Sequence, residues 1–102
     1  PGQGGRCQEF ALVAALLLAG TTQIGVFAAS TDGTDGPTDV SGAYVDGDTV
    51  EICEQKGLSV ETHLNDHNAT PLLKAIDAAI ITGPTGSNVN DIYAALIMPK
   101  KA

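Results

Sequence analysis

Long apolar runs alternate with short polar, glycine-bearing segments along this chain. The first run, Gln8 to Ala19, is rich in Ala and Leu, and Gly20 follows it where a helix would end. This pattern predicts a helix that is apolar nearly all round, so we expect other elements to cover it on most sides. A second run, Gln23 to Ala29, is short and aliphatic, which predicts a buried strand.

Shorter elements are predicted in the middle of the chain. The segment Val40 to Val45 fits either a short helix or an extended piece. A helix over 48–56 begins at a capping Asp or Thr and stops at a glycine. Ser59 is the expected N-cap of a second short helix. A third helix is expected over 70–77, with its proline at the first helical position.

Two more apolar runs complete the pattern and predict the fold class. Ala78 to Thr82 and Ile92 to Met98 both indicate buried strands. Helices that alternate with about three buried strands predict a small layered α/β domain. A chain of 102 residues is the length of a single domain, so we expect one domain over 1–102. The chain begins with Pro1 rather than Met, and we therefore expect it to be a fragment of a larger, two-domain protein.

Charge and cysteine content narrow the function classes. The net charge is −7 and the pI is about 4.3, which argues against nucleic acids and anionic membrane surfaces as partners. The run Phe10 to Ala19 is too short to span a bilayer, and we favour a buried helix there over a secretion signal. Cys7 and Cys53 form neither a Cys-x-x-Cys pair nor a zinc spacing, so we expect free thiols and a cytoplasmic protein.

One basic residue stands out by its position. Arg6 is the single arginine of the chain, and it follows two glycines where the first apolar run begins. A guanidinium stays charged and donates in a fixed plane, which suits carboxylates and phosphates. Arginine at a helix N-terminus is electrostatically unfavourable, so stability alone would place an acidic residue there. Arg6 is therefore our candidate anion-binding residue; the alternative is a surface residue paired with Glu9 or a nearby aspartate.

The loop Thr31–Asp39 concentrates oxygen ligands. It contains three carboxylates and three hydroxyls in nine residues, and it follows a predicted strand. Such hard oxygens suit Mg²⁺, which keeps several waters and shares its site with a phosphate, so one or two aspartates would suffice. Asp32 and Asp35 are the candidate ligands. The alternative is a tight loop whose aspartates bond to their own backbone, and spacing by itself favours that alternative.

A second polar loop, Gly83–Asp91, offers backbone N–H groups beside Thr85, Ser87 and Asn88. Such a nest can hold phosphate or carboxylate oxygens, although the loop lacks a P-loop signature. The alternative is a glycine turn that joins two strands. His63 and His67 stand four residues apart, but no third metal ligand of fitting spacing follows, which favours a solvated pair.

Three segments together carry a family resemblance. Gly4–Glu9, Thr31–Asp39 and Thr82–Asp91 are similar, in order and spacing, to the C-terminal MOFRL domain of the glycerate 2-kinases. Some members of that family are named hydroxypyruvate reductase. The resemblance covers nearly the whole chain, and the long second segment makes it specific. One position departs from the family pattern, because Cys7 stands where most members have Asn.

The resemblance implies an enzyme larger than this chain. It would transfer the γ-phosphoryl group of ATP to D-glycerate with Mg²⁺, giving 2-phosphoglycerate, in a cleft between this domain and an N-terminal Rossmann-like domain. Arg6 would be the active-site residue that compensates phosphate charge or clamps the glycerate carboxylate. The residues expected to bind substrate or phosphate oxygens are Thr31, Asp32, Thr34, Asp35, Thr82, Gly83, Thr85, Gly86 and Asn88.

The chain by itself would have half a cleft, so we expect the isolated fragment to be inactive. It would expose apolar surface where the N-terminal domain docks, which favours self-association. Two alternatives to a kinase remain. An NAD(P)H-dependent hydroxypyruvate reductase would need its nicotinamide site upstream, because the chain has no Gly-x-Gly-x-x-Gly after a strand. A non-catalytic interaction module is the other.

Overall fold

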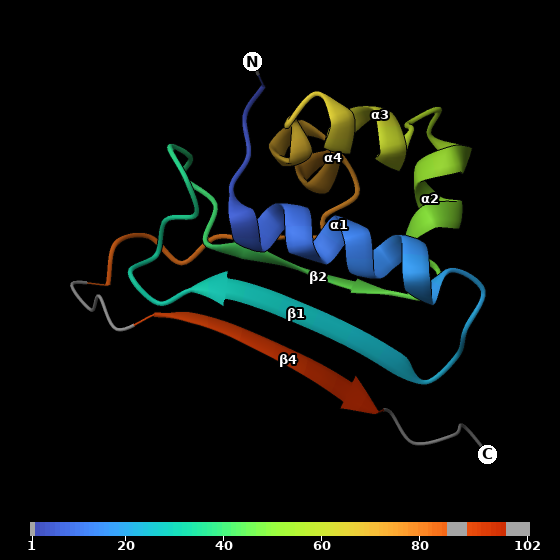
Figure 1. Ribbon diagram of the computed structural model, residues 1–102, viewed down its shortest axis with the longest axis horizontal. Coiled ribbons are helices and arrows are strands. Elements are labelled where there is room, and N and C mark those ends of the chain that lie inside the picture. Colours follow the sequence, from blue (N-terminus) through green and yellow to red (C-terminus); the bar gives the residue numbers. More distant parts are fainter. Residues whose placement is uncertain (1, 86–89, 98–102) are drawn as a thin grey trace.

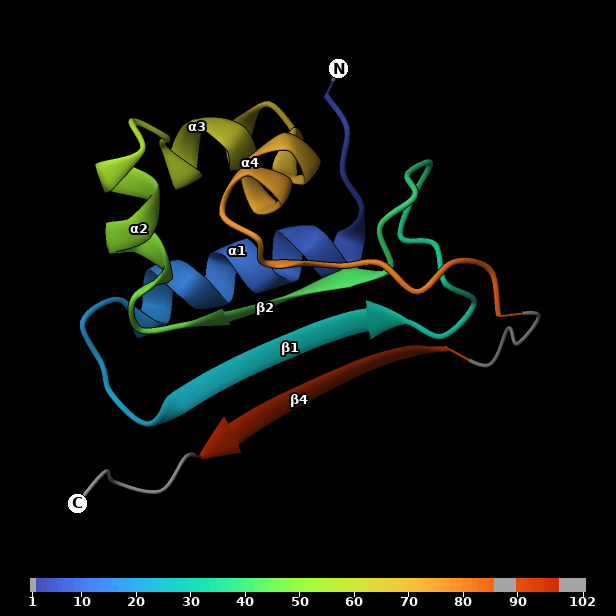
Figure 2. The ribbon, with the colours of Figure 1, turned by 180° about the vertical axis from the view of Figure 1, so that it is seen from behind.

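The computed structural model describes residues 2–85 and 90–97. Within them, helices lie on one side of a four-stranded antiparallel sheet (Figures 1 and 2). The elements in chain order are α1 (Arg6–Leu18), β1 (Ile24–Ser30), β2 (Gly42–Asp46), α2 (Thr49–Gln55), α3 (Val60–Asn65), α4 (Ala69–Ala75), β3 (Ala79–Ile80) and β4 (Asp91–Ile97). The small layered α/β domain that the sequence predicts is confirmed.

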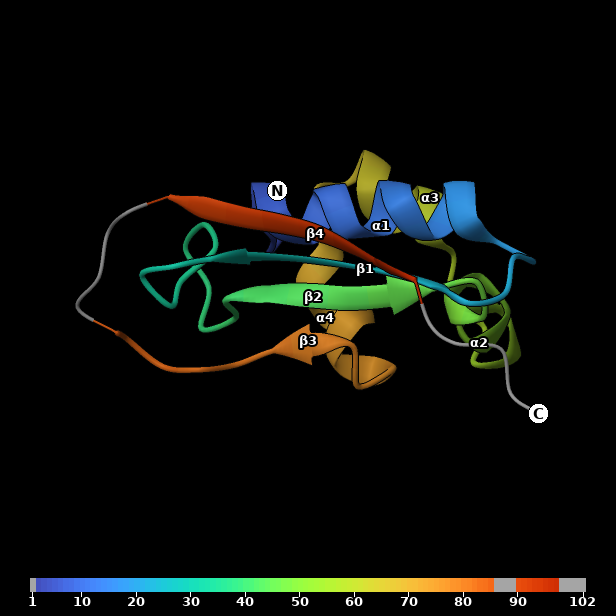
Figure 3. The same ribbon diagram turned by 90° about the horizontal axis from the view of Figure 1, so that it is seen from below.

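The sheet has the strand order β3-β2-β1-β4, which Figure 3 shows from below. Val26 of β1 lies opposite Val45 of β2 on one side and Ala95 of β4 on the other. β4 is therefore joined to the sheet by β1 along one edge only, as far as the described residues go. Within the described part of the chain, the helices leave the face seen in Figure 3 uncovered.

The core lies between α1, the sheet and the short helices. Ala11, Leu12 and Ala15 project from one side of α1 and are fully buried. They pack in one cluster with residues of β2 and with Leu72 and Leu73 of α4. Alanines on that side let the α1 backbone approach the sheet, and each buried leucine contributes about 1.5–3 kcal/mol. This packing fixes the N-terminus of α1 at one end of the sheet.

Several local predictions are corrected by the structure. Val40 to Val45, left open between helix and extended chain, contributes most of β2, which brings the number of strands to four. The run Ala78 to Thr82 pairs over Ala79–Ile80. Pro71 is the third residue of α4 rather than the first. The helix tolerates it there because the first four N–H groups of any helix lack an intrahelical acceptor. The Ser59 cap is confirmed, since its hydroxyl accepts the Thr62 N–H at 3.2 Å.

Two predicted burials are wrong for the chain as described. The last two strands were both expected to be buried, yet Ile81, in the run Ala78 to Thr82, is 57% exposed and Ile97 of β4 is 86% exposed. α1 is covered on most sides, as expected, and has one exposed side that includes Leu17. β4 begins at Asp91 and ends at Ile97, so Met98 lies outside the described residues. The reason is topological, because β4 occupies an edge position where the described helices do not reach over it.

Expectations about membrane and cysteine chemistry can be checked directly. α1 contains 13 residues, which is about 20 Å of helix against a hydrocarbon core of about 30 Å. None of the helices among the described residues is long and apolar enough to cross a membrane. Cys7 and Cys53 are both buried free thiols, as the sequence predicts.

Candidate anion-binding cleft

Three segments that are distant in sequence meet at one end of the sheet. These are the N-terminus of α1, the loop that leaves β1, and the start of β4 (Figures 1 and 2). An open cleft of about 420 Å³ lies among them. Its lining residues are Arg6, Ser30, Asp32, Thr34, Asp35, Gly36 and Asp91. The structure therefore brings the candidate arginine and the first polar loop together.

Arg6 reaches the cleft as half of an ion pair. Its Nε donates to the carboxylate of Asp91, the first residue of β4. The arginine side chain is 76% exposed, whereas the aspartate side chain is only 8% exposed. The hydrogen bond and charge of the guanidinium hold the pKa of Asp91 below its usual range. Tyr93 adds a longer hydrogen bond of 3.4 Å from its hydroxyl to the same carboxylate oxygen.

The two alternatives for Arg6 thus turn out to be compatible. It is paired with an aspartate, as a surface residue would be, and it also lines the cleft. The pairing uses Nε, and most of the guanidinium faces solvent. An arginine anchored in this way can present its terminal nitrogens to an anion without losing its own position. Sequence reasoning did not identify Asp91 as the partner of Arg6. The one feature that could have indicated it is the position of this carboxylate between a polar loop and an apolar run.

Asp32 is held in the tight turn that the sequence allowed. Its Oδ1 accepts from the Ser30 hydroxyl at 2.7 Å and from the Thr34 N–H at 2.9 Å. The Thr34 hydroxyl donates to the same oxygen at 3.2 Å. These bonds, the backbone one foremost, lower the pKa of Asp32, so the carboxylate is ionised at neutral pH. The local turn and the cleft position coexist, because all three bonds use Oδ1 and the side chain still lines the cleft.

Asp35 has a structural task. It is buried, and its two carboxylate oxygens accept the backbone N–H groups of Cys7 at 3.0 Å and Gln8 at 2.7 Å. It thereby caps α1 from a different segment, which α1 needs because Gly5 at its N-cap has no side chain to do so. With both oxygens bound to the helix, Asp35 fixes the floor of the cleft, and Asp32 is the better placed of the two aspartates for a ligand.

The second polar loop is fastened to the first. The Thr85 N–H donates to the Asp32 carbonyl at 3.3 Å, and the Thr85 hydroxyl donates to the Thr31 carbonyl at 2.6 Å. Gly33 has a φ of +92°, and a Cβ there would overlap the carbonyl oxygen of Gly83. The two loops are therefore in contact, as a shared site requires. The predicted donors Gly86 and Asn88 lie outside the described residues.

Thr82 makes its described side-chain hydrogen bonds to residues that do not line the cleft. Its hydroxyl is 2.8 Å from that of Ser41 and donates to the Gly83 carbonyl at 3.0 Å. The hydroxyl therefore serves the junction between β3 and the following loop. Like Thr31, Gly83 and Thr85, Thr82 is absent from the residues that line the cleft within the described chain. Its assignment as an oxygen-binding residue stays a prediction for the complete site.

The two histidines and Cys7 do not belong to a clustered metal site in the described residues. The described part of the chain contains no group of three or more His, Cys, Asp or Glu suited to a metal ion. α3 ends before His67, so the two histidines do not share a helix face: His63 bonds to the Ser59 carbonyl and His67 to Glu9. Burial raises the pKa of the Cys7 thiol to about 12, which fits the structural role expected from the sequence.

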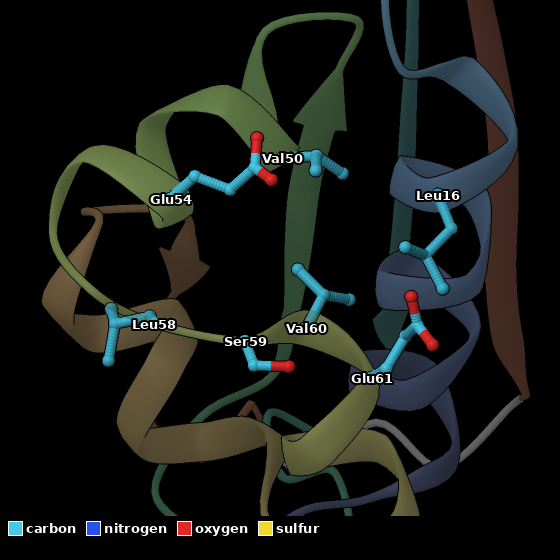
Figure 4. Close-up of a pocket in the computed structure, with 7 residues that line it drawn as sticks. All are labelled: Leu16, Val50, Glu54, Leu58, Ser59, Val60 and Glu61. Atoms are coloured by element: carbon cyan, nitrogen blue, oxygen red, sulfur yellow. The ribbon is translucent and has the colours of Figure 1, made fainter.

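A second, smaller cleft lies at the other end of the helical layer (Figure 4). Its volume is about 170 Å³, and α1, α2 and α3 supply its walls. Two carboxylates, Glu54 and Glu61, stand on its rim among aliphatic side chains. Because these charges repel anions, this cleft suits neither a phosphate nor a hydroxy acid. The cleft at Arg6 combines a cation with hydroxyls and is the better candidate.

Comparison with known proteins decides the family. A model described as "MOFRL family" matches residues 1–91. The chain belongs to the MOFRL family. A glycerate 2-kinase of Pyrococcus horikoshii is 43% identical over 100 residues, and a protein of Agrobacterium vitis, named as a suggested hydroxypyruvate reductase, is 42% identical over 96 residues. The crystal structure of glycerate kinase from Thermotoga maritima superposes with a TM-score of 0.93 at 45% identity.

The MOFRL family chain described here is much shorter than these relatives. It is covered to 98% by the P. horikoshii match, to 94% by the A. vitis match and to 96% by the T. maritima structure. It spans only 22%, 22% and 24% of their own lengths, respectively. The match falls on the C-terminal portion of the relatives. This MOFRL domain thus corresponds to a fragment of the glycerate kinases that it resembles.

Proposed function

We propose that this chain is the C-terminal domain of a glycerate 2-kinase. The complete enzyme would transfer the γ-phosphoryl group of ATP to the 2-hydroxyl of D-glycerate, giving 2-phosphoglycerate and ADP. The observation that carries the proposal is the meeting of Arg6 with Asp32 and Thr34 around one open cleft. The relatives named glycerate kinase, and the superposition with one of them, support it. An N-terminal domain of the same polypeptide would supply the opposite wall.

Arg6 is the residue we assign to charge compensation. Phosphoryl transfer requires little covalent chemistry from the protein, but it requires the acceptor oxygen and γ-phosphorus in line and the equatorial oxygens neutralised. A guanidinium anchored through Nε has two further nitrogens with which to bind phosphate oxygens or the glycerate carboxylate. The ion pair with Asp91 lets it act from a fixed position, which lowers the entropy that the transition state must lose.

Asp32 is the residue we assign to Mg²⁺. The donor set fits the ion as a shared ligand rather than as a full protein cage, because one hard carboxylate lines the cleft and its Oδ2 lies outside the three bonds made by Oδ1. Bound with ATP, the ion neutralises phosphate charge. Asp35 contributes by holding the α1 N-terminus against the loop rather than by contacting the ion.

The remaining predicted residues would form the rim. Thr31 and Thr85 join the two loops, Gly83 lies against Gly33, and Thr34 orients Asp32. We propose that the part of the second loop that contains Gly86 and Asn88 supplies N–H and amide donors to substrate oxygens. Both cysteines are free thiols, which fits a reducing compartment such as the cytoplasm.

The decisive test is an assay of the complete protein with D-glycerate, ATP and Mg²⁺. Replacing Arg6 with Ala is expected to lower kcat/KM on the order of a hundredfold or more, as loss of a group that stabilises transition-state charge does. Lys56→Ala is the matched control, because this exposed cation lies at the C-terminal end of α2. Equal kcat/KM for wild type and Arg6→Ala would reject the assigned role.

The same protein tests the alternatives. A hydroxypyruvate reductase would oxidise NAD(P)H in the presence of hydroxypyruvate and leave ATP unchanged, so parallel assays of the two cosubstrates separate the activities. An interaction module would show neither. We expect the 102-residue chain by itself to be inactive and to self-associate through exposed apolar side chains. A dilution-independent monomer in light scattering would contradict the second expectation.

A further inference from the structure

The edge strand β4 is exposed on both of its faces. After Asp91 it consists of six apolar residues. Ile92 is 49% exposed and Leu96 is 48% exposed, and alternation places them on the open face of the sheet. Tyr93 and Ile97 point to the helix face, and they are 46% and 86% exposed. In the described chain, β4 is bonded to β1 along one edge, and its other edge is unpaired.

α1 continues this exposed surface. Phe10, Val13 and Leu17 recur at spacings of three and four, so they share one side of the helix, and their exposed fractions are 46%, 47% and 79%. The ring centroids of Phe10 and Tyr93 are 4.6 Å apart. α1 and β4 run in the same direction (Figure 1), so the exposed side of the helix and β4 extend together. We call these side chains the β4 surface: Phe10, Val13, Leu17, Ile92, Tyr93, Leu96 and Ile97.

Such a strand has the composition of an interior strand. Strands that are apolar on both faces occur where layers cover both sides of a sheet. Natural edge strands usually carry lysines, prolines or bulges that prevent further pairing. From Ile92 to Ile97 there is no charged residue and no proline, and the pairing with β1 continues without a bulge over seven positions. β4 therefore has the features of a strand that another strand adjoins.

The relatives indicate what adjoins it. More than three quarters of the length of the P. horikoshii and T. maritima proteins lies outside the match to this chain. We propose that the polypeptide preceding this domain adds a strand along β4 and covers the β4 surface with apolar side chains. The proposal rests on the proposed function in one respect, that the chain is part of a longer polypeptide. It adds where that polypeptide docks, which is along the β4 edge of the sheet, opposite the edge occupied by β3.

A second copy of this chain fits the surface less well. Two β4 strands paired edge to edge would satisfy their backbone groups. They would also place two sets of exposed side chains next to each other and leave both faces of each β4 strand uncovered. A longer polypeptide can supply both a strand and the layers above and below it. The occupant we infer is therefore the upstream part of the same protein.

Hydrogen–deuterium exchange of the complete protein tests the pairing. In an antiparallel ladder, the amides of alternate residues point away from the existing partner. We expect every amide from Ile92 to Ile97 to exchange on the order of 100-fold more slowly than in an unstructured peptide. Exchange of half of these amides at the unstructured rate would overturn the proposal, as would protection that is lost when an oligomer is diluted to the monomer. This readout does not depend on activity, so an inactive protein with a protected β4 rejects only the proposed function.

A matched pair of substitutions tests whether the upstream polypeptide covers the β4 surface. Ile97 is 86% exposed and Ile52 of α2 is 38% exposed in the described chain, so lysine should be tolerated better at position 97 if nothing covers it. The proposal expects the reverse in the complete protein. Ile97→Lys is expected to lower Tm by about 5 °C or more, and by clearly more than Ile52→Lys does. Equal shifts, or a larger shift at position 52, would overturn it. If Ile97→Lys does not fold, the exchange measurement on the wild type decides.

Discussion

The Nε of Arg6 donates a hydrogen bond to the carboxylate of Asp91, so the first residue of α1 is tied to the first residue of β4. The two residues are 85 positions apart in the chain. Their pairing forms one side of the open cleft beside the loop Thr31–Asp39 and anchors the one arginine of an acidic chain. It also explains how an arginine is accommodated at a helix N-terminus, because the aspartate offsets the unfavourable helix dipole.

Asp91→Asn is expected to weaken the site through Arg6. In the complete enzyme we expect kcat/KM to fall on the order of tenfold, because a hydrogen bond to a charged group contributes about 1.5 kcal/mol. The effect should disappear when Arg6 is already Ala, since both changes then act on the same contact. A double-mutant cycle measures this coupling. Additive losses would mean that Asp91 acts independently of Arg6.

The ion pair also predicts a pH dependence. The pKa of Asp91 is lower in the folded protein than in the unfolded chain, because Arg6 donates to its charged form. Its contribution to stability is therefore complete above the ordinary carboxyl pKa of about 3.9 and is lost as the pH falls through the lower, folded value. An NMR titration of the side-chain carboxyl carbon measures this. Arg6→Ala should move the pKa of Asp91 back toward about 3.9; an unchanged pKa would disprove the assigned cause.

Asp35→Asn should destabilise the fold more than an ordinary surface change. The amide offers one acceptor where the carboxylate serves the N–H groups of both Cys7 and Gln8, so one buried donor loses its partner. We expect the free energy of unfolding to fall by about 1–3 kcal/mol in urea denaturation. Asp39→Asn is the control, because that exposed carboxylate bonds to Lys74 and such pairs contribute about 0–1 kcal/mol. Equal losses of unfolding free energy in the two variants would contradict the capping role of Asp35.

Cys7 is expected to be unreactive in the folded protein. Burial raises the pKa of the thiol to about 12, so very little thiolate is present at pH 8, and the side chain is also buried. Labelling with a disulfide reagent should be slow under native conditions and fast in denaturant. Cys53 is buried as well, and burial also raises its pKa, so both thiols should follow unfolding. Rapid labelling of Cys7 in the native protein would contradict a buried thiol with a raised pKa.

Gly33→Ala should separate steric contact from backbone strain. Gly33 and Gly57 both have positive φ, at +92° and +72°. A Cβ at Gly33 overlaps the Gly83 carbonyl, whereas a Cβ at Gly57 has no heavy atom within 4 Å. Gly57→Ala should therefore cost about 1 kcal/mol from strain, and Gly33→Ala clearly more, because the two loops must also separate. Thermal unfolding of both variants measures the difference, and equal costs would show that the contact is unimportant.

Local signals in the sequence predict the helices well and the strands less well. The α1 run and the Ser59 cap depend on neighbouring residues, and the structure confirms both. β2 was ambiguous because Gly42 and small residues interrupt its pattern, and its pairing partners Ile24–Ser30 and Ala79–Ile80 are distant in the chain. The predicted burial of β4 fails in the described chain because exposure depends on what adjoins the strand rather than on its own composition.

In the candidate site, too, local composition identified some residues, whereas roles that depend on long-range contacts were missed. Arg6 and the loop Thr31–Asp39 could be identified because both have unusual compositions, and the structure places them around one cleft. Asp91 was missed as the partner of Arg6, since the contact joins opposite ends of the chain. The capping role of Asp35 required knowing that its loop lies against the start of α1. The catalytic roles of these residues stay predictions for the complete enzyme.

The contact between Gly33 and Gly83 affects the conformational entropy that binding a substrate would cost. The loop that follows β1 and the loop that precedes β4 are joined by backbone contacts, and Thr85 adds two hydrogen bonds across them. These contacts hold the described parts of the two loops together. Little conformational entropy would be lost there on binding, so more of the interaction energy remains for discriminating one hydroxy acid from another.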